Sequence, residues 1–179
     1  PGRRLTNEGT GRAYGLEVLL RHNPTSRFFG WISYTLMRSE RKDAGADEHR
    51  LFDFDQTHIL SVLGQYRITN EWEFGARFRY VSGIPQTPFV GSVYNSDSDS
   101  FEGISGEVNS IRMPAFHALD IRVDRNWIFD TWLLTAYFEI RNTYNHANVE
   151  ALDYNFDFTE RSYTTGLPII PSLGLRGEF

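Results

Sequence analysis

Hydrophobic and polar residues alternate along most of this chain. The alternation is sharpest from Trp72 to Tyr80, where every even-numbered residue is apolar or aromatic and every odd-numbered residue is charged or glycine. Successive side chains of a β-strand point to opposite faces of its sheet, so residues with a period of two share a face. This stretch is therefore predicted to be a strand with one apolar face and one polar face.

The same period predicts seven strands, at residues 12–22, 27–38, 56–68, 72–80, 117–125, 131–142 and 171–179. The connections between them alternate in length, with short turns at 23–26, 69–71 and 126–130 and long segments at 39–55, 82–113 and 143–170. Inside the last long segment, residues 150–158 and 161–165 are expected to pair as a hairpin standing above the sheet. In an antiparallel sheet this order puts every long segment at the same end.

Such an order of connections is typical of outer-membrane β-barrels, which have tight periplasmic turns and long extracellular loops. A sandwich or a Greek key has no reason to place all long loops together. Trp72, Trp127 and Trp132 flank the short-turn end, where an interfacial aromatic girdle would lie, whereas the parity of Trp31 would direct it inward. The fold is therefore predicted to be all-β, an antiparallel transmembrane β-barrel with long extracellular loops.

In such a barrel the apolar face meets lipid and the polar face meets water or other protein groups, because an Arg or Lys at mid-membrane costs about 2–4 kcal/mol. We expect the inward charges to pair with one another across neighbouring strands. These charges are Glu73, Arg77, Arg79, Asp120, Arg122, Glu139 and Arg141.

The last predicted strand indicates whether these seven strands could form a whole barrel. Leu173, Leu175 and Phe179 share one face, and the chain's final residue is an aromatic one. Seven is an odd number of strands, whereas bacterial single-chain barrels have an even number. The chain is therefore expected to be part of a larger barrel, with Pro1–Gly11 as the tail of an extracellular loop. One edge of the last strand is expected to pair with residues 131–142 and the other with residues outside these 179.

Composition narrows the function further. The net charge is −5 with no basic face or arm, which argues against binding to nucleic acid. Aromatic residues make up 15% of the chain, which suits strands and interfaces. There is no cysteine, so a disulfide framework, thiol catalysis and Cys-ligated zinc are excluded.

For each candidate chemical site, an ordinary structural role is the favoured explanation. The acidic run 95–102 offers oxygen ligands for Ca²⁺ but lacks the EF-hand spacing, so a solvated loop tip is favoured. Histidines 22, 49, 58, 117 and 146 are scattered, without metal-ligand spacing on a common strand face. No nucleophile motif is present. We therefore expect no catalytic, cofactor or metal site, and no enzyme activity.

Six segments together resemble one family: Asn7–Glu17, Phe52–His58, Arg79–Pro88, Arg112–Arg122, Glu139–Asn145 and Gly166–Phe179. In this order, at the ends of alternating strands, they resemble the C-terminal part of a TonB-dependent outer-membrane receptor of Gram-negative bacteria. The resemblance covers nearly the whole chain. It implies that residues 1–179 are the last seven strands of a barrel of about 22 strands around an N-terminal plug, with the plug and earlier strands absent from this chain.

The same resemblance implies a function and partners. The receptor would take up a scarce nutrient (a metal chelate, cobalamin or an oligosaccharide) across the outer membrane, driven by the TonB complex. Its partners would be the plug and earlier strands, TonB, membrane lipid and lipopolysaccharide, and the extracellular nutrient. The last strand, with Leu173, Leu175 and Phe179, would be the signal read by the barrel-assembly machinery.

Two alternatives stay open from the sequence. A related outer-membrane barrel without active transport would serve as a surface adhesin or assembly scaffold. A soluble β-rich binding domain would stay folded in buffer without detergent.

Overall fold

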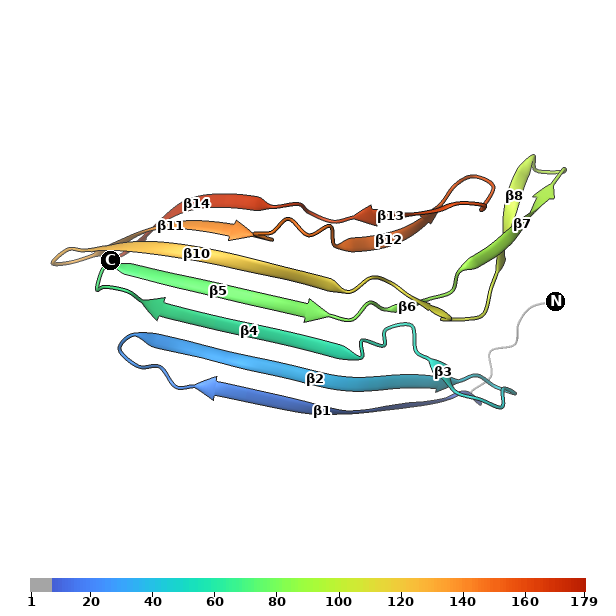
Figure 1. The fold of residues 1–179 in the computed structure, drawn as a ribbon, viewed down its shortest axis with the longest axis horizontal. Helices are drawn as coiled ribbons and strands as arrows, with labels where there is room; N and C mark the ends of the chain where they lie inside the picture. Colours follow the sequence, from blue (N-terminus) through green and yellow to red (C-terminus); the bar gives the residue numbers. More distant parts are fainter. Residues whose placement is uncertain (1–7) are drawn as a thin grey trace.

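The computed structural model describes residues 8–179, and within them it contains strands and no helix. The main sheet follows chain order and every neighbouring pair is antiparallel (Figure 1). Its strands are β1 (Thr10–His22), β2 (Phe28–Lys42), β4 (His58–Arg67), β5 (Trp72–Val81), β10 (Phe116–Ile128), β11 (Leu133–Arg141) and β14 (Ile170–Glu178), with the short β3 (Arg50–Leu51) beside β2. The described part of the chain has no helix long and apolar enough to span a membrane.

All seven strands predicted from the alternation are confirmed, with small changes at their ends. β2 continues to Lys42, beyond the predicted end at residue 38, because β1 supplies backbone partners as far as the pair Thr10↔Lys42. β10 likewise continues to Ile128, which pairs with Leu133 and shortens the turn expected at 126–130. Backbone pairing thus carries the strands past the point where the side-chain pattern becomes polar.

The long segments lie at one end of the sheet, opposite the short turns, and two of them form hairpins (Figure 1). β12 (Val149–Tyr154) and β13 (Arg161–Thr165) pair as predicted, although β12 ends at Tyr154 rather than at residue 158. Segment 82–113 connects β5 and β10 as the expected long loop, but it contains two strand pairs that the sequence pattern did not predict. They are β6 (Pro85–Gln86) with β9 (Ile111–Arg112), and β7 (Phe89–Asn95) with β8 (Ser100–Ser105). A register shift between Phe89 and Gly91 breaks the alternation there, which hides the strand from a period-two pattern.

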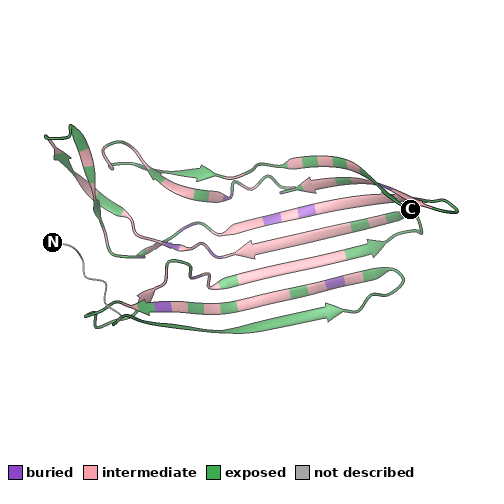
Figure 2. Ribbon diagram, turned by 180° about the vertical axis from the view of Figure 1, so that it is seen from behind, coloured by how far each residue is buried: buried purple, intermediate pink, exposed green. Residues whose placement is uncertain are grey.

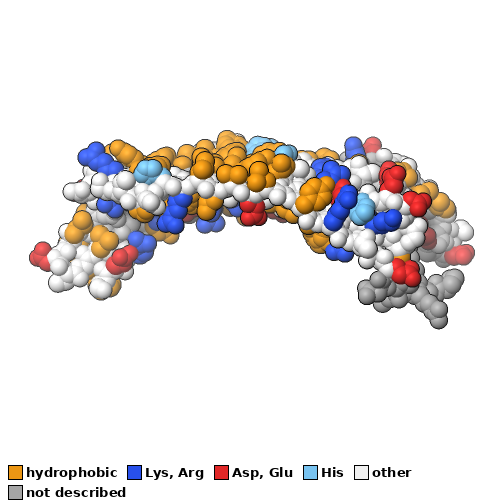
Figure 3. Space-filling view, turned by 90° about the horizontal axis from the view of Figure 1, so that it is seen from below, with side chains coloured by type: hydrophobic (Ala, Val, Ile, Leu, Met, Phe, Trp, Pro, Cys, Tyr) orange, Lys and Arg blue, Asp and Glu red, His pale blue; other side chains and the backbone are white. Residues whose placement is uncertain are grey.

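The main sheet is a single layer, and its seven long strands lie side by side with no second layer drawn over them (Figure 2). Seen from below the molecule is arched, with hydrophobic side chains gathered along the convex side and charged ones beneath the arch (Figure 3). In the described residues only three apolar side chains are buried, Pro85, Met113 and Ala118. A core in the usual sense is therefore missing from residues 8–179, and the apolar face is uncovered.

The sheet is open. β14 pairs with β11 along one edge, and β1 pairs only with β2 among the described residues. The prediction of an all-β antiparallel fold is confirmed, whereas residues 8–179 do not close into a barrel. Most of the expected N-terminal loop tail lies in residues 1–7, outside the described residues.

Candidate membrane-facing surface and polar inner face

The register of the strands joins their apolar residues into one continuous surface, here called the apolar face. Ala76 lies opposite Gly64 on β4 and Ile121 on β10, and Phe78 lies opposite Val62 and Leu119. The same parity continues to both edges of the sheet. Its members include Leu16, Val18, Leu20, Ile32, Tyr34, Leu60, Val62, Phe74, Ala76, Phe78, Leu119, Ile121, Val123, Leu134, Ala136, Phe138, Ile140, Leu173 and Leu175.

Charge is confined to the two ends of the apolar face. Arg12, Arg38, Glu40 and Lys42 share its parity at the long-loop end, and Arg125 does so at the short-turn end. Arg12 and Arg38 each contact the Glu40 carboxylate at 2.6 Å. The middle of the surface is apolar on all seven strands. Its side chains are partly exposed on the inner strands and strongly exposed on the edge strands, where Leu20 is 62% and Leu173 80% exposed.

An aromatic girdle lies at the short-turn end. The guanidinium of Arg125 lies 5.0 Å from the ring centre of Trp72 and 5.1 Å from that of Trp127. Trp132 stacks on Phe129 at 4.5 Å and on the ring of the last residue, Phe179, at 5.7 Å. The expectation that three tryptophans gather at this end is confirmed, as is the opposite parity of Trp31, which pairs with Leu63.

Histidine and tyrosine side chains meet at the other end of the sheet. Tyr34 Oη lies 2.8 Å from His58 Nδ1, and His117 Nδ1 lies 2.8 Å from Tyr144 Oη. The rings of His117 and His146 stack with their centres 3.6 Å apart. His117 and His146 are far apart in the sequence, and the loop after β11 brings their rings together. No group of three or more His, Cys, Asp or Glu side chains in residues 8–179 is arranged to hold a metal ion.

The opposite side of the sheet, here called the polar face, carries ion pairs between neighbouring strands. Asp120 lies between Arg77 at 2.7 Å and Arg79 at 3.9 Å, and it also accepts the backbone N–H of Asn142 at 3.0 Å. The predicted pairing of Asp120 with inward arginines is thereby confirmed. Glu73 also pairs across neighbouring strands, but with Arg67 of β4, which was not among the inward charges named from the sequence.

A second cluster of charges follows on β10 and β11. Arg122 binds Asp124 at 2.6 Å and approaches Glu139 at 3.9 Å, while Glu139 also accepts a bond from Arg141 at 2.9 Å. The alternation of β10 already placed Asp124 on the same face as Asp120, and the structure adds its ion pair with Arg122. These charges line a hollow of about 640 Å³ beneath the arch.

A glycine and an aromatic ring stabilise the pairing of the last strand. Tyr137 lies opposite Gly174, and its ring occupies the space where a Cβ on Gly174 would lie. The guanidinium of Arg122 in turn lies 4.0 Å from the centre of that ring. A bare glycine under an aromatic side chain of the next strand is a recognised way to pin strand register.

Gly174→Ala is therefore expected to destabilise the β11–β14 pair by about 1–3 kcal/mol, because the ring of Tyr137 must move off Arg122. Gly177→Ala is the matched control, since its nearest contact would be an ordinary 3.4 Å from the Phe179 ring. Urea unfolding of the full-length protein in lipid measures both. Equal effects of the two variants would show that the ring does not hold the register.

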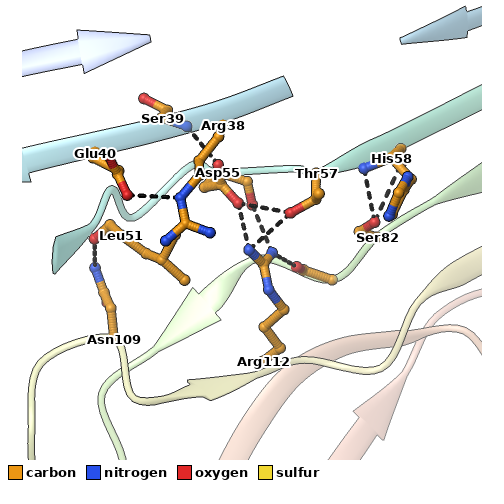
Figure 4. A network of polar contacts seen from close by, with 11 residues as sticks. Arg38, Ser39, Glu40, Leu51, Asp55, Thr57, His58, Ser82, Asn109 and Arg112 are labelled. Atoms are coloured by element: carbon orange, nitrogen blue, oxygen red, sulfur yellow. Dashed lines mark hydrogen bonds and ion pairs between the residues drawn. The ribbon is translucent and has the colours of Figure 1, made fainter. Parts of the chain in front are cut away.

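At the long-loop end a buried carboxylate ties β2 to the connections that follow β2 and β5 (Figure 4). The side chain of Asp55 has no exposed surface and accepts bonds from Arg112, from the backbone N–H of Ser39 at 2.6 Å and from Thr57 Oγ1 at 3.1 Å. Arg112 also donates to the carbonyl of Gly83 at 2.8 Å. Burial acts to raise the pKa of Asp55, but the bonds from Arg112 and Ser39 outweigh it and lower this pKa below its usual value. Asp55 is therefore ionised at neutral pH.

Comparison with protein-family models, curated proteins and solved structures found no significant match. The family resemblance of the six segments therefore stays a prediction. The structure adds that several of them touch one another: Asp55, Gly83 and Arg112 come from three segments, and Asp120 and Asn142 from two.

The acidic run 95–102 forms the tip of the β7–β8 hairpin. Tyr94 Oη donates to Asp99 at 2.5 Å, and the Asn95 amide donates to Glu102 at 2.6 Å. These contacts stabilise a tight, exposed turn, in which Asp99 has φ of 51°. The arrangement favours the solvated loop tip over a calcium site.

Proposed function

We propose that this chain is a wall segment of an outer-membrane β-barrel that works as a TonB-dependent receptor and transporter. The observation that carries the proposal is the apolar face, which runs without a charge through the middle of all seven strands on an uncovered sheet. A soluble sheet covers such a face with a second layer, because exposed apolar patches of this extent promote association. In a membrane, lipid would cover the apolar face in place of a second protein layer.

The lengths of the strands and the aromatic residues at both ends of the sheet support a position in a membrane. The seven strands have 9 to 15 residues, and a tilted strand needs about 9–11 residues to cross the hydrocarbon layer. Tryptophans at one end and a tyrosine–histidine belt at the other bracket the apolar face, in the way that aromatic residues mark the two membrane–water interfaces. In this orientation the hairpins β7–β8 and β12–β13 extend outside the cell.

The two edges of the sheet that have no pairing strand within residues 8–179 support membership in a larger barrel. A backbone edge left in lipid costs several kcal/mol for each unsatisfied polar group, so β1 and β14 require further strands of the same receptor beside them. The charged polar face then lines the lumen, where an N-terminal plug, TonB-driven movement and a scarce nutrient would meet it. The barrel-assembly machinery would recognise β14 with Leu173, Leu175 and Phe179, whose side chains are strongly exposed.

Labelling with a membrane-impermeant maleimide tests the orientation, because the chain has no cysteine of its own. In intact Gram-negative cells that make the full-length protein, Ser98→Cys at the β7–β8 tip is expected to be labelled. Asn70→Cys, in the short turn before β5, is expected to react only after the outer membrane is opened. Labelling of both positions in intact cells would contradict the proposed orientation.

TonB dependence is tested separately from orientation. Full-length protein solubilised from outer membranes is expected to bind the purified periplasmic domain of TonB. Failure to bind, for protein that passes the labelling test, would favour the adhesin or scaffold alternative over active transport.

A further inference from the structure

The two extracellular-end hairpins form one unit. The ring of Phe89 on β7 lies 5.1 Å from Tyr154 and 4.8 Å from Phe158 of the other hairpin. The backbone N–H of Phe89 donates to Tyr154 Oη at 3.1 Å, and Ser92 Oγ donates to the carbonyl of Asp157 at 2.6 Å. Contacts between residues so far apart in sequence fix how β7–β8 and β12–β13 lie against each other.

An aromatic slot opens between them, with a volume of about 710 Å³. We use the name aromatic slot for the cavity lined by the rings Phe89, Tyr94, Phe101, Tyr154, Phe156 and Phe158. Two of its rings are largely open to solvent, Phe156 at 80% and Tyr94 at 52%. Phe158 has φ of 59°, an uncommon backbone conformation for a bulky residue, and its ring lies against those of Phe89 and Tyr154.

The aromatic slot lies in a strongly acidic part of the chain. No Lys or Arg occurs between Arg79 and Arg112 or between Arg141 and Arg161. The same two segments contain eight carboxylates: Asp97, Asp99, Glu102, Glu107, Glu150, Asp153, Asp157 and Glu160. Asp99 and Asp153 line the slot itself, whereas Arg161, which lies opposite Tyr154 in the β12–β13 pair, is not among its lining residues.

We propose that the aromatic slot binds a small organic cation, such as a ligand with a quaternary ammonium group. Aromatic faces attract a cation placed within about 6 Å of the ring centre. The surrounding carboxylates add attraction that an uncharged or anionic ligand does not receive. The inference deepens the proposed function, on which it rests, because it assigns the receptor a cationic cargo and disfavours an anionic metal chelate.

Choline and its uncharged isostere 3,3-dimethylbutanol form the test pair, since they share a shape and differ in charge. Binding to detergent-solubilised full-length protein is measured by calorimetry at low salt. We expect choline to bind and the isostere to bind at least several-fold more weakly. No choline binding at millimolar concentrations, or equal binding of both compounds, would overturn the proposal.

Two variants locate the binding. Phe156→Ala removes an exposed ring and is expected to weaken choline binding by about 3- to 30-fold. Phe54→Ala removes another exposed ring of the long-loop end, 71% exposed, that does not line the slot, and it is expected to leave binding unchanged. Equal loss in both variants would overturn the assignment to this slot.

The experiments distinguish failure of one proposal from failure of the other. If Ser98→Cys is labelled from outside but choline does not bind, only the aromatic slot is wrong. If choline binds but the labelling pattern is reversed, the proposed membrane orientation is wrong and the slot still stands.

Discussion

Ala76→Arg is expected to abolish most insertion of the full-length protein into the outer membrane, whereas Gly75→Arg is expected to preserve it. Ala76 lies in the middle of the apolar face between Gly64 and Ile121. An arginine there would sit in hydrocarbon, at a cost of about 2–4 kcal/mol near the bilayer midplane. A side chain introduced at the neighbouring Gly75 would lie on the polar face, where water and charged groups can surround a guanidinium.

The measurement is the folded fraction in purified outer membranes, read from heat-dependent migration on gels and from protease resistance. Gly75 is a suitable partner because an added Cβ there would meet nothing closer than 4.0 Å. Gly75→Gln separates size from charge, since Gly75 lies opposite Arg122 and a new arginine adds some repulsion. Equal insertion of Ala76→Arg and Gly75→Arg would show that the assigned lipid face is wrong.

Arg112→Met is expected to destabilise the loop end of the sheet by about 3–5 kcal/mol, because it leaves the buried Asp55 carboxylate without its charged partner. The loss would appear as faster hydrogen exchange at the Ser39 amide, which donates to the same carboxylate. Loosening of the loops between β2 and β4 and between β5 and β10 should follow, since Arg112 bonds to both.

Charge, rather than the bulk of the side chain, is responsible for that loss. The double variant Asp55→Asn with Arg112→Met is therefore expected to recover much of the stability. Arg176→Met is the matched control: Arg176 pairs with Glu178 at 3.0 Å, but both side chains are more than half exposed, so little change is expected. A loss as large for Arg176→Met as for Arg112→Met would contradict the special role of the buried pair.

The strands that were predicted show alternating apolar and polar residues in the sequence, whereas the hairpin that was not predicted lacks a regular alternation. Residues 72–80 alternate without exception, and they became β5 with that register of faces. The β12–β13 hairpin also showed in the pattern. The β7–β8 hairpin did not, because adjacent Phe89 and Val90 and a bulge interrupt the period, and its rings pack on the other hairpin rather than on the sheet.

The charged contacts needed the register of the strands. Parity alone placed Arg77, Glu73 and Asp120 on one face, which is correct. Which arginine meets which carboxylate depends on the stagger between strands, and this gives Arg77 to Asp120 and Arg67 to Glu73. The contacts between Asp55 and Arg112 and between His117 and His146 had no sequence signal at all, because they join segments separated by folded chain.

The amino-acid sequence by itself determined the seven strands, their two faces and the end at which the long connections lie. A side-chain period of two and the length of each connection are local properties, and they survive whatever the chain packs against. Only the tertiary structure decided the buried Asp55–Arg112 pair, the Tyr137–Gly174 contact and the aromatic slot. Each of these joins residues that are distant in the chain, and their meeting depends on register and on the folding of loops, which no local pattern encodes.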